Sequence, residues 1–316
     1  MAYLVFRQLL VMVLICLVGF LLARWKHFDG RESQFLSYLL LYIVVPCVCI
    51  DAYNMSFDRD EFSYVLIMLG LSLLLFLLVI LFSSLLFRTP KSKEDDKRCS
   101  IDKMILVYSN AGYIGIPIIN ATLGESAVFY LTAFLLIFNS VLWIHGQYLM
   151  THTITPRVIF TKPAVLGCIF SLILFISPWK LPYVAGNTVH LFASLNTPLS
   201  MLVLGIVFSE FHMHKEQLPV KHLVEVTLFR LFGVPMLVLF LLFLGRPFFS
   251  STPTLQTLSL ILLVVSACPA GMTATNFALL YKKDYDYASL VIAITTVLCV
   301  VTLPICTALG EKVLFH

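Results

Sequence analysis

Charged side chains are scarce in this sequence. Only 12% of its 316 residues are charged, whereas 60% are hydrophobic. In an ordinary water-soluble domain about one residue in four is charged. So few charges cannot cover a water-exposed surface, and we therefore expect lipid to be the solvent for most of the chain.

The motifs of metal sites and of intramembrane enzymes are also missing. The eight cysteines include no C-x-x-C pair, and seven of them lie in apolar stretches, where we expect them to pack as small apolar residues. The chain contains no H-E-x-x-H, no G-x-S-x-G and no pair of intramembrane aspartates placed for catalysis. The sequence therefore predicts no metal, no cofactor and no enzymatic activity, and nothing in it indicates a nucleic-acid partner.

Apolar segments of about 20 residues, the length that crosses a bilayer core, recur along the whole chain. The expected spans are 3–23, 35–53, 62–87, 104–122, 126–150, 159–177, 187–208, 222–244, 255–280 and 286–309. The predicted fold class is an all-α integral membrane protein of about ten transmembrane helices, with no separate soluble domain. The longest connector, 88–103, is interpreted as a solvated cytoplasmic loop.

Lysine and arginine are unevenly distributed between alternate connections. With the N-terminus outside, the cytoplasmic loops would hold 15 of the 21 basic residues and the opposite side would hold five. Cytoplasmic loops of membrane proteins carry an excess of basic residues. This bias predicts a multi-pass protein of the cell (plasma) membrane with its N- and C-termini outside.

The chain divides into two halves of similar plan, residues 1–150 and 151–316. The second helix of each half carries a proline within the span, Pro46 and Pro198 respectively, and the fourth helix of each half is interrupted by glycine and proline. With five helices per half, the second half enters the membrane in the opposite sense. This is the plan of an inverted repeat, in which paired interrupted helices are typical of a transporter binding site.

The first interruption is predicted within residues 109–120, S-N-A-G-Y-I-G-I-P-I-I-N. Pro117 lacks an N–H and its ring clashes with the carbonyl four residues back, so we expect the helix to break there. Unpaired backbone groups cannot face lipid, so this stretch should be buried in protein or line a wet cavity. A half-helix that begins at Pro117 would direct its positive dipole end toward that cavity, which suits an anion. The alternative is a simple kink with packing glycines.

The second interruption is predicted within residues 267–276, A-C-P-A-G-M-T-A-T-N. Pro269, Ala270 and Gly271 allow another backbone to approach closely, and Asn276 with two threonines supplies uncharged donors and acceptors. If the two interruptions cross near the midplane, four half-helix ends converge on one point.

Several of these residues resemble a known family. Asn110, Gly115 and Pro117, spaced N-x4-G-x-P, are similar to the fourth-helix signature of the auxin efflux carrier family, which includes bacterial malate and malonate permeases and plant PIN-type carriers. Asn139 resembles that family's fifth-helix asparagine, and C-P-A at 268–270 resembles its ninth helix. The resemblance implies two inverted five-helix repeats, crossing broken helices, an elevator-type motion and a homodimer through the first, second, sixth and seventh helices.

The resemblance also implies a substrate near the crossing prolines, with the two asparagines beside it. The predicted substrate-binding residues are Asn110, Tyr113, Gly115, Asn139, Ala270, Gly271, Asn276 and Arg230, with Pro117 and Pro269 at the helix crossover.

Arg230 is a strong charge deep within a span, where a side chain is expected to face the protein interior and to have a partner. It is either the counter-charge of a carboxylate substrate or a structural residue paired with helix-end carbonyls, Glu225 or Glu125. His145, in the fifth span, is either titratable near neutral pH or a structural histidine.

Together these features predict a secondary transporter that moves a small organic anion by alternating access. The substrate would be a carboxylate such as malate or malonate, or an auxin-like acid. The expected partners are that anion and the lipid bilayer, and coupling to a proton or to sodium is left open because the spans lack paired central carboxylates. The alternative is a membrane receptor or sensor that binds a small ligand in the same fold without transport.

Overall fold

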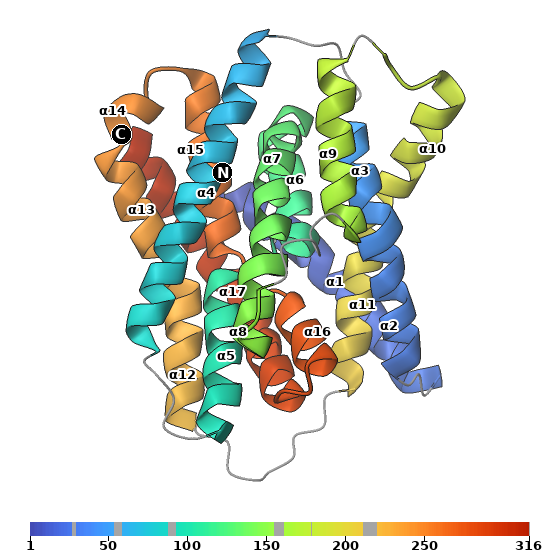
Figure 1. Cartoon of the computed structure of the whole chain (residues 1–316), viewed down its shortest axis with the longest axis vertical. Coiled ribbons are helices and arrows are strands. Elements are labelled where there is room, and N and C mark those ends of the chain that lie inside the picture. The colour runs from blue at the N-terminus through green and yellow to red at the C-terminus, as the bar shows by residue number, and fades with distance from the viewer. Residues whose placement is uncertain are drawn as a thin grey trace.

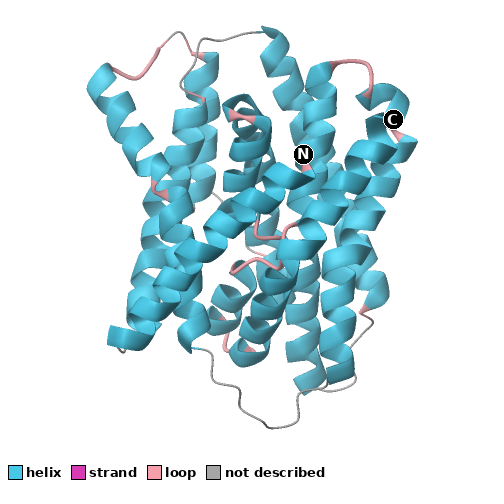
Figure 2. Ribbon diagram, turned by 180° about the vertical axis from the view of Figure 1, so that it is seen from behind, coloured by secondary structure: helices cyan, strands magenta, loops and turns pink. Residues whose placement is uncertain are grey.

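The structure is a computed structural model that describes residues 1–26, 30–53, 59–87, 93–154, 161–177, 179–210 and 220–315. Within these ranges every regular element is a helix (Figures 1 and 2). The α-helices are α1 (Ala2–Lys26), α2 (Gly30–Leu39), α3 (Val45–Ala52), α4 (Arg59–Leu86), α5 (Lys93–Val107), α6 (Ile116–Leu123), α7 (Glu125–Val141), α8 (Gln147–Thr151), α9 (Pro163–Ile176), α10 (Tyr183–Ser194), α11 (Asn196–Glu210), α12 (Val220–Leu228), α13 (Val234–Leu244), α14 (Arg246–Phe249), α15 (Pro253–Ala267), α16 (Thr273–Leu280) and α17 (Tyr285–Phe315).

Seven helical segments among the described residues are long and apolar enough to cross a membrane. They are Ala2–Trp25, Phe35–Ala52, Arg59–Leu86, Glu125–Thr151, Tyr183–Ser209, His222–Leu244 and Tyr285–Leu314. Three shorter apolar helices, Ala111–Leu123, Val165–Ile176 and Pro253–Ala267, coincide in part with the other three expected spans. The all-helical membrane class is therefore confirmed. Part of the loops used for the charge count lies outside the described residues.

Proline accounts for most of the π-helical turns in the described chain. Three such turns each end two residues before a proline: Leu40–Val44 before Pro46, Ala111–Gly115 before Pro117, and Phe229–Gly233 before Pro235. Proline removes one backbone donor and crowds the carbonyl four residues back, and a wider turn relieves that crowding while the helix continues. Pro117 therefore widens its helix instead of ending it. The prediction that a half-helix begins at Pro117 is wrong, since helical structure already starts at Ala111.

Helix α5 occupies most of the segment that was interpreted as a solvated loop, 88–103. Asp102 on α5 is only 1% exposed, accepts a hydrogen bond from the hydroxyl of Tyr287 (2.7 Å), and lies 2.6 Å from Nε2 of His222. A buried carboxylate is tolerated because these partners satisfy it. The loop interpretation is therefore wrong for the described part, where Asp102 ties α5 to α12 and α17, and residues 88–92 lie outside the described residues.

The helices pack in two groups. The α1 group comprises α1, α2, α3, α9, α10 and α11, and the α4 group comprises α4, α5, α7, α8, α12, α13, α15, α16 and α17; the two groups contact each other directly where α1 packs on α17 and where α3 and α9 pack on α7. Figure 1 shows much of the α1 group on the right and much of the α4 group on the left. Helix α6 and the π-helical turn before it contact both groups, because they touch α11 on one side and α15 on the other.

The α1 group is held together by close backbone approach. A Cβ atom on Gly19 would collide with the backbone oxygen of Leu202, and one on Gly205 would collide with that of Cys16, so α1 and α11 meet backbone to backbone. Helices in membranes associate through such small residues, because lipid gives no hydrophobic force between apolar helices.

Candidate functional site

Two interruptions of helical structure lie at the centre of the bundle. The first interruption, residues 108–110, separates α5 from the π-helical turn that leads into α6, and the second interruption, residues 268–272, separates α15 from α16. Figure 2 shows the short loop segments near mid-height, away from both ends of the bundle. Two broken helices thus occur where the sequence predicts them, although the first break precedes Pro117.

The two interruptions run antiparallel and are hydrogen-bonded to each other. The contacts are a bridge between Ser109 and Ala270, a bond from the N–H of Asn110 to the carbonyl of Pro269 (2.9 Å), and a bond from the N–H of Gly271 to the carbonyl of Tyr108 (3.0 Å). Each interruption thereby provides hydrogen-bond partners for backbone N–H and C=O groups that have no partner within their own helix. Such pairing is needed because lipid offers no hydrogen bonds to backbone at membrane depth.

Gly271 is required by this close approach. A Cβ atom at this position would lie 2.9 Å from the carbonyl oxygen of Ser109 and 3.0 Å from that of Tyr108. Gly115 also lies against the second interruption but has more room, since a Cβ atom there would lie 3.6 Å from the sulfur of Cys268, an ordinary van der Waals distance. These contacts bring two predicted site glycines, one from each half of the chain, to the crossing.

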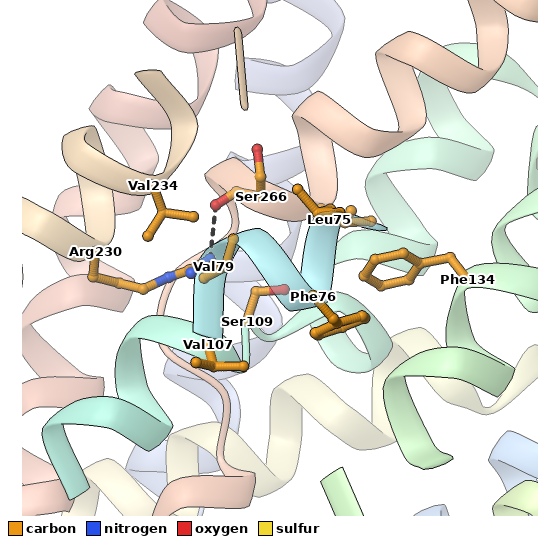
Figure 3. Close-up of a pocket in the computed structure, with 10 residues that line it drawn as sticks. Leu75, Phe76, Val79, Val107, Ser109, Phe134, Arg230, Val234 and Ser266 are labelled. Carbon is orange, nitrogen blue, oxygen red and sulfur yellow. Dashed lines mark hydrogen bonds between the residues drawn. The ribbon is translucent and has the colours of Figure 1, made fainter. Parts of the chain in front are cut away.

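Arg230 joins the ends of both interrupted helices. Its side chain is 1% exposed and donates to the carbonyls of Leu106 (2.8 Å), Ser266 (2.7 Å) and Cys268 (2.6 and 3.2 Å). Figure 3 shows the guanidinium reaching toward Ser266. These carbonyls end α5 and α15, where the helix dipoles are negative, so a cation is stabilised there.

The partners of Arg230 are thus helix-end carbonyls, one of the alternatives left open by the sequence, rather than the carboxylates of Glu225 or Glu125. Four hydrogen bonds engage most of the five N–H donors of a guanidinium. Its role toward a substrate stays a prediction.

A small cavity lies beside Arg230 (Figure 3). Its volume is about 20 Å³, and its polar lining comes from Ser109, Arg230 and Ser266. That volume holds one water molecule, whereas organic ligands occupy pockets of about 300 Å³ or more. The cavity therefore suits a water that solvates the crossing.

The opposite side of the first interruption faces the α1 group. From α11, the amide of Asn196 donates to the carbonyl of Gly112 (3.2 Å), and the hydroxyl of Ser200 donates to that of Tyr113 (3.4 Å). The side-chain nitrogen of Asn110 and the side-chain oxygen of Asn196 are buried without a hydrogen-bond partner among the described residues. Buried polar atoms of this kind need an explanation, and a bound ligand is one.

Space is available at the same turn. A Cβ atom placed on Gly112 would meet no atom of the described residues within 4 Å. The first interruption therefore combines open space, an unpaired amide donor on Asn110 and an unpaired amide acceptor on Asn196. A ligand with both acceptor and donor groups would satisfy these atoms.

The structure places the other predicted residues at varying distances from the crossing. Tyr113 is buried in the turn that follows the first interruption, and Asn276 is half-buried on α16. Asn139 is buried on α7 and donates to the carbonyl of Leu135 within its own helix (2.8 Å). Its neighbour Phe138 packs on Tyr108 with ring centroids 5.7 Å apart, so α7 lies against the first interruption.

Some residues at the crossing were not predicted. Thr295 on α17 accepts from the N–H of Ala270 (3.3 Å), and Asn196 and Ser200 approach from α11. A signal existed for Asn196, an amide two residues before Pro198 within a span. His145 lies 3.0 Å from the hydroxyl of Tyr108, which gives this histidine a structural partner.

Comparison with known proteins adds the family. A family model described as "Membrane transport protein", the auxin efflux carrier domain, matches residues 4–159 and again residues 149–307. No curated protein matches the chain. The two matched regions together cover almost the entire sequence, which confirms the resemblance drawn from the fourth- and ninth-helix residues, and the chain therefore belongs to the auxin efflux carrier family of membrane transporters.

Proposed function

We propose that this protein is a secondary transporter that moves a small organic anion across the membrane by alternating access. The substrate class is a carboxylate such as malate or malonate, or an auxin-like acid. Family membership supports membrane transport. The paired interruptions support alternating access, because crossing broken helices from two repeats are a recurrent binding-site architecture of secondary transporters.

The observation that carries this proposal is the open side of the first interruption. Helical structure begins there at Ala111, and the first N–H groups of a helix have no intrahelical partner. They carry the positive end of the helix dipole, which favours a carboxylate. The unpaired amide nitrogen of Asn110 adds a side-chain donor at the same turn.

The two helix groups support an elevator-type motion. In this proposal the chain forms ten spans in two inverted five-helix repeats, residues 1–150 and 151–316, with both termini outside the cell membrane. The α1 group would be the stationary part and would form the homodimer, and the α4 group would move with the crossing. Helix α11 holds two carbonyls of the π-helical turn after the first interruption through Asn196 and Ser200, so movement of the α4 group would exchange these hydrogen bonds.

The experiment is counterflow in proteoliposomes with labelled malate and malonate, in the presence and absence of a pH or sodium gradient. We expect saturable exchange by the wild-type protein and loss of exchange in Asn110→Ala, with an unchanged unfolding temperature, because the amide nitrogen of Asn110 has no hydrogen-bond partner to lose among the described residues. The matched control is Asn120→Ala, since Asn120 is exposed further along the same helix. Wild-type rates in Asn110→Ala would show that the site is misplaced.

The same assay separates the alternative function. A receptor or sensor would bind malonate saturably, as measured by the thermal shift of the detergent-solubilised protein, yet would exchange no label under any gradient. Ligand stabilisation without exchange would therefore replace the transporter proposal by the sensor.

A further inference from the structure

A histidine lies between two carboxylates at one end of the α4 group. Nε2 of His222 on α12 is 2.6 Å from a carboxylate oxygen of Asp102, and Nδ1 of the same ring is 3.9 Å from a carboxylate oxygen of Glu225. A neutral imidazole has one N–H, and its other nitrogen is an acceptor, whereas the imidazolium donates from both nitrogens. With a carboxylate facing each nitrogen, the arrangement favours the protonated ring.

The surroundings of Asp102 also favour a positive charge on the histidine. One oxygen of this buried carboxylate accepts from the hydroxyl of Tyr287 (2.7 Å), and the other faces His222. A buried carboxylate needs a cation as well as hydrogen bonds. Among the described residues, the ion pair of Asp102 is made with His222. The imidazolium form is therefore the one that matches both oxygens of Asp102.

The other groups that face the histidine leave this balance in place. Arg98 of α5 lies in the same cluster, but it pairs with Asp284, directly before α17 (3.5 Å). The ring of Tyr287 is stacked on that of His222, with centroids 6.3 Å apart, and Phe87, just beyond α4, meets it edge-on at 5.9 Å. The neighbours thus supply two carboxylates, one cation that has its own partner, and two aromatic rings.

Each helix that meets in this cluster continues to a residue that holds the crossing. Helix α5 runs from Asp102 to the first interruption. Helix α12 leads from His222 into the π-helical turn that carries Arg230, and α17 leads from Tyr287 to Thr295. Eight residues of helix, the spacing in the last two cases, span about 12 Å. Figure 1 shows α5 and α12 next to each other at the lower end of the bundle, in line with their direct contact.

We infer that the cluster of Asp102, His222 and Glu225 is a proton-binding site, and that the bound proton holds α5, α12 and α17 in the geometry that the crossing needs for transport. When His222 releases this proton to water, its ring keeps a single N–H for two carboxylates. The bond to Asp102 also loses the assistance of charge, which makes such bonds roughly twice as strong as neutral ones.

The site is accessible to protons. The side chain of His222 is 31% exposed, and α12 begins just before it, at Val220, after the expected cytoplasmic loop 209–221. Histidine is the side chain whose charge changes in the physiological range of pH. With the termini outside, acid in the cytoplasm would therefore activate the transporter. The proton site stands on its own geometry, and only its effect on transport rests on the proposed function.

The first test follows stability against pH in His222→Gln, in which an amide N–H can still donate to Asp102 but no proton can be taken up. Thermal unfolding of the detergent-solubilised protein is measured from about pH 5.5 to 8.5, which brackets the titration of histidine. We expect the wild type to lose stability as the pH rises, because deprotonation weakens the cluster, and His222→Gln to lose less. The matched control is His190→Gln, since His190 pairs with Asp51 (3.0 Å) in the α1 group. It should keep the wild-type fall.

The second test is counterflow of malonate with the same pH on both sides, so that no proton gradient drives it. Dividing the wild-type rate by that of His222→Gln removes the effect of pH on malonate itself. We expect this ratio to fall at least about fivefold between pH 5.5 and 8.5, the lower end of typical coupling between sites. Glu225→Gln, a change at a half-exposed side chain, should move the wild-type transition to lower pH, because it removes one of the two carboxylates that favour the proton.

The outcomes separate the inference from the proposed function. The same pH dependence of unfolding in the wild type and in His222→Gln, or an unmoved transition in Glu225→Gln, would overturn the proton site. Unfolding that depends on His222 and pH, together with a rate ratio that does not change with pH, would overturn its link to the crossing. Absence of malonate exchange at every pH would overturn the proposed function, whereas the unfolding measurements would still decide the proton site.

Discussion

The two interruptions cross as a pair, yet they are held by different neighbours. In the π-helical turn that directly follows the first, the carbonyls of Gly112 and Tyr113 accept hydrogen bonds from α11 of the α1 group. At the second, the N–H of Ala270 donates to Thr295 on α17, within the α4 group. The first interruption therefore lies at the seam between the groups, and the second lies inside one of them.

This difference indicates different roles for the two interruptions. The second interruption has a glycine that the crossing requires, Gly271, and it is enclosed by its own group. The first ends at Asn110, whose amide nitrogen has no partner among the described residues, and is followed by open space at Gly112. We therefore expect changes at the second to act mainly on folding, and changes at the first to act mainly on transport.

Removing Arg230, which donates hydrogen bonds to carbonyls at both interruptions, should have the largest effect on stability. In Arg230→Met the carbonyls of Leu106, Ser266 and Cys268 lose their donor inside the protein. Each buried carbonyl left unpaired costs about 1–3 kcal/mol, so we expect a loss of at least about 3 kcal/mol of stability. Thermal unfolding of the detergent-solubilised protein measures it.

Arg230→Lys is the control, because an ammonium keeps the charge but lacks the fork that reaches two helices at once. It should unfold between the wild type and Arg230→Met. A wild-type unfolding temperature in Arg230→Met would mean that the two helix ends do not depend on this residue.

A smaller effect is expected from adding one methyl group within the second interruption or just after the first. In Gly271→Ala the new Cβ atom would lie 2.9 Å from the carbonyl oxygen of Ser109, so the crossing must shift, at a cost of about 1–3 kcal/mol. Gly112→Ala meets no atom within 4 Å and should preserve stability, while the methyl group occupies the open space and lowers the rate of malonate exchange. Unfolding and counterflow are measured on both variants. Equal unfolding temperatures would remove the contrast between the two breaks.

The sequence predicted the second interruption more accurately than the first, for a reason that lies in backbone geometry. Pro269 lies within the second interruption, because its missing N–H coincides with the end of α15. Pro117 does not lie within the first, because the π-helical turn Ala111–Gly115 accommodates it and the chain opens earlier, at 108–110. The spacing of glycine and proline indicates that a helix is disturbed, but it does not distinguish a widened turn from a break.

The partners of charged residues were harder to predict than the elements. Arg230 was recognised as a buried charge, but carbonyls at helix ends have no sequence signature, so its partners stayed open. Asp102 was missed because it stands in a charged run that resembles a solvated loop. The partners of Asp102 depend on how α5 packs against α12 and α17, which residue spacing does not reveal.

The smallest change in stability, and the sharpest comparison, is expected from the two side chains that hold the interruptions. Asn196→Ala and Thr295→Val each remove one hydrogen bond to the backbone of a break, worth about 1 kcal/mol. The two variants should therefore unfold at similar temperatures. Because Asn196 belongs to α11 and carries the unpaired oxygen at the open side, only Asn196→Ala should alter malonate exchange, either through KM or through the rate at which the groups separate. If Thr295→Val lost transport at wild-type stability while Asn196→Ala kept it, the substrate would contact the second interruption. The roles of the two interruptions would then be the reverse of those proposed here.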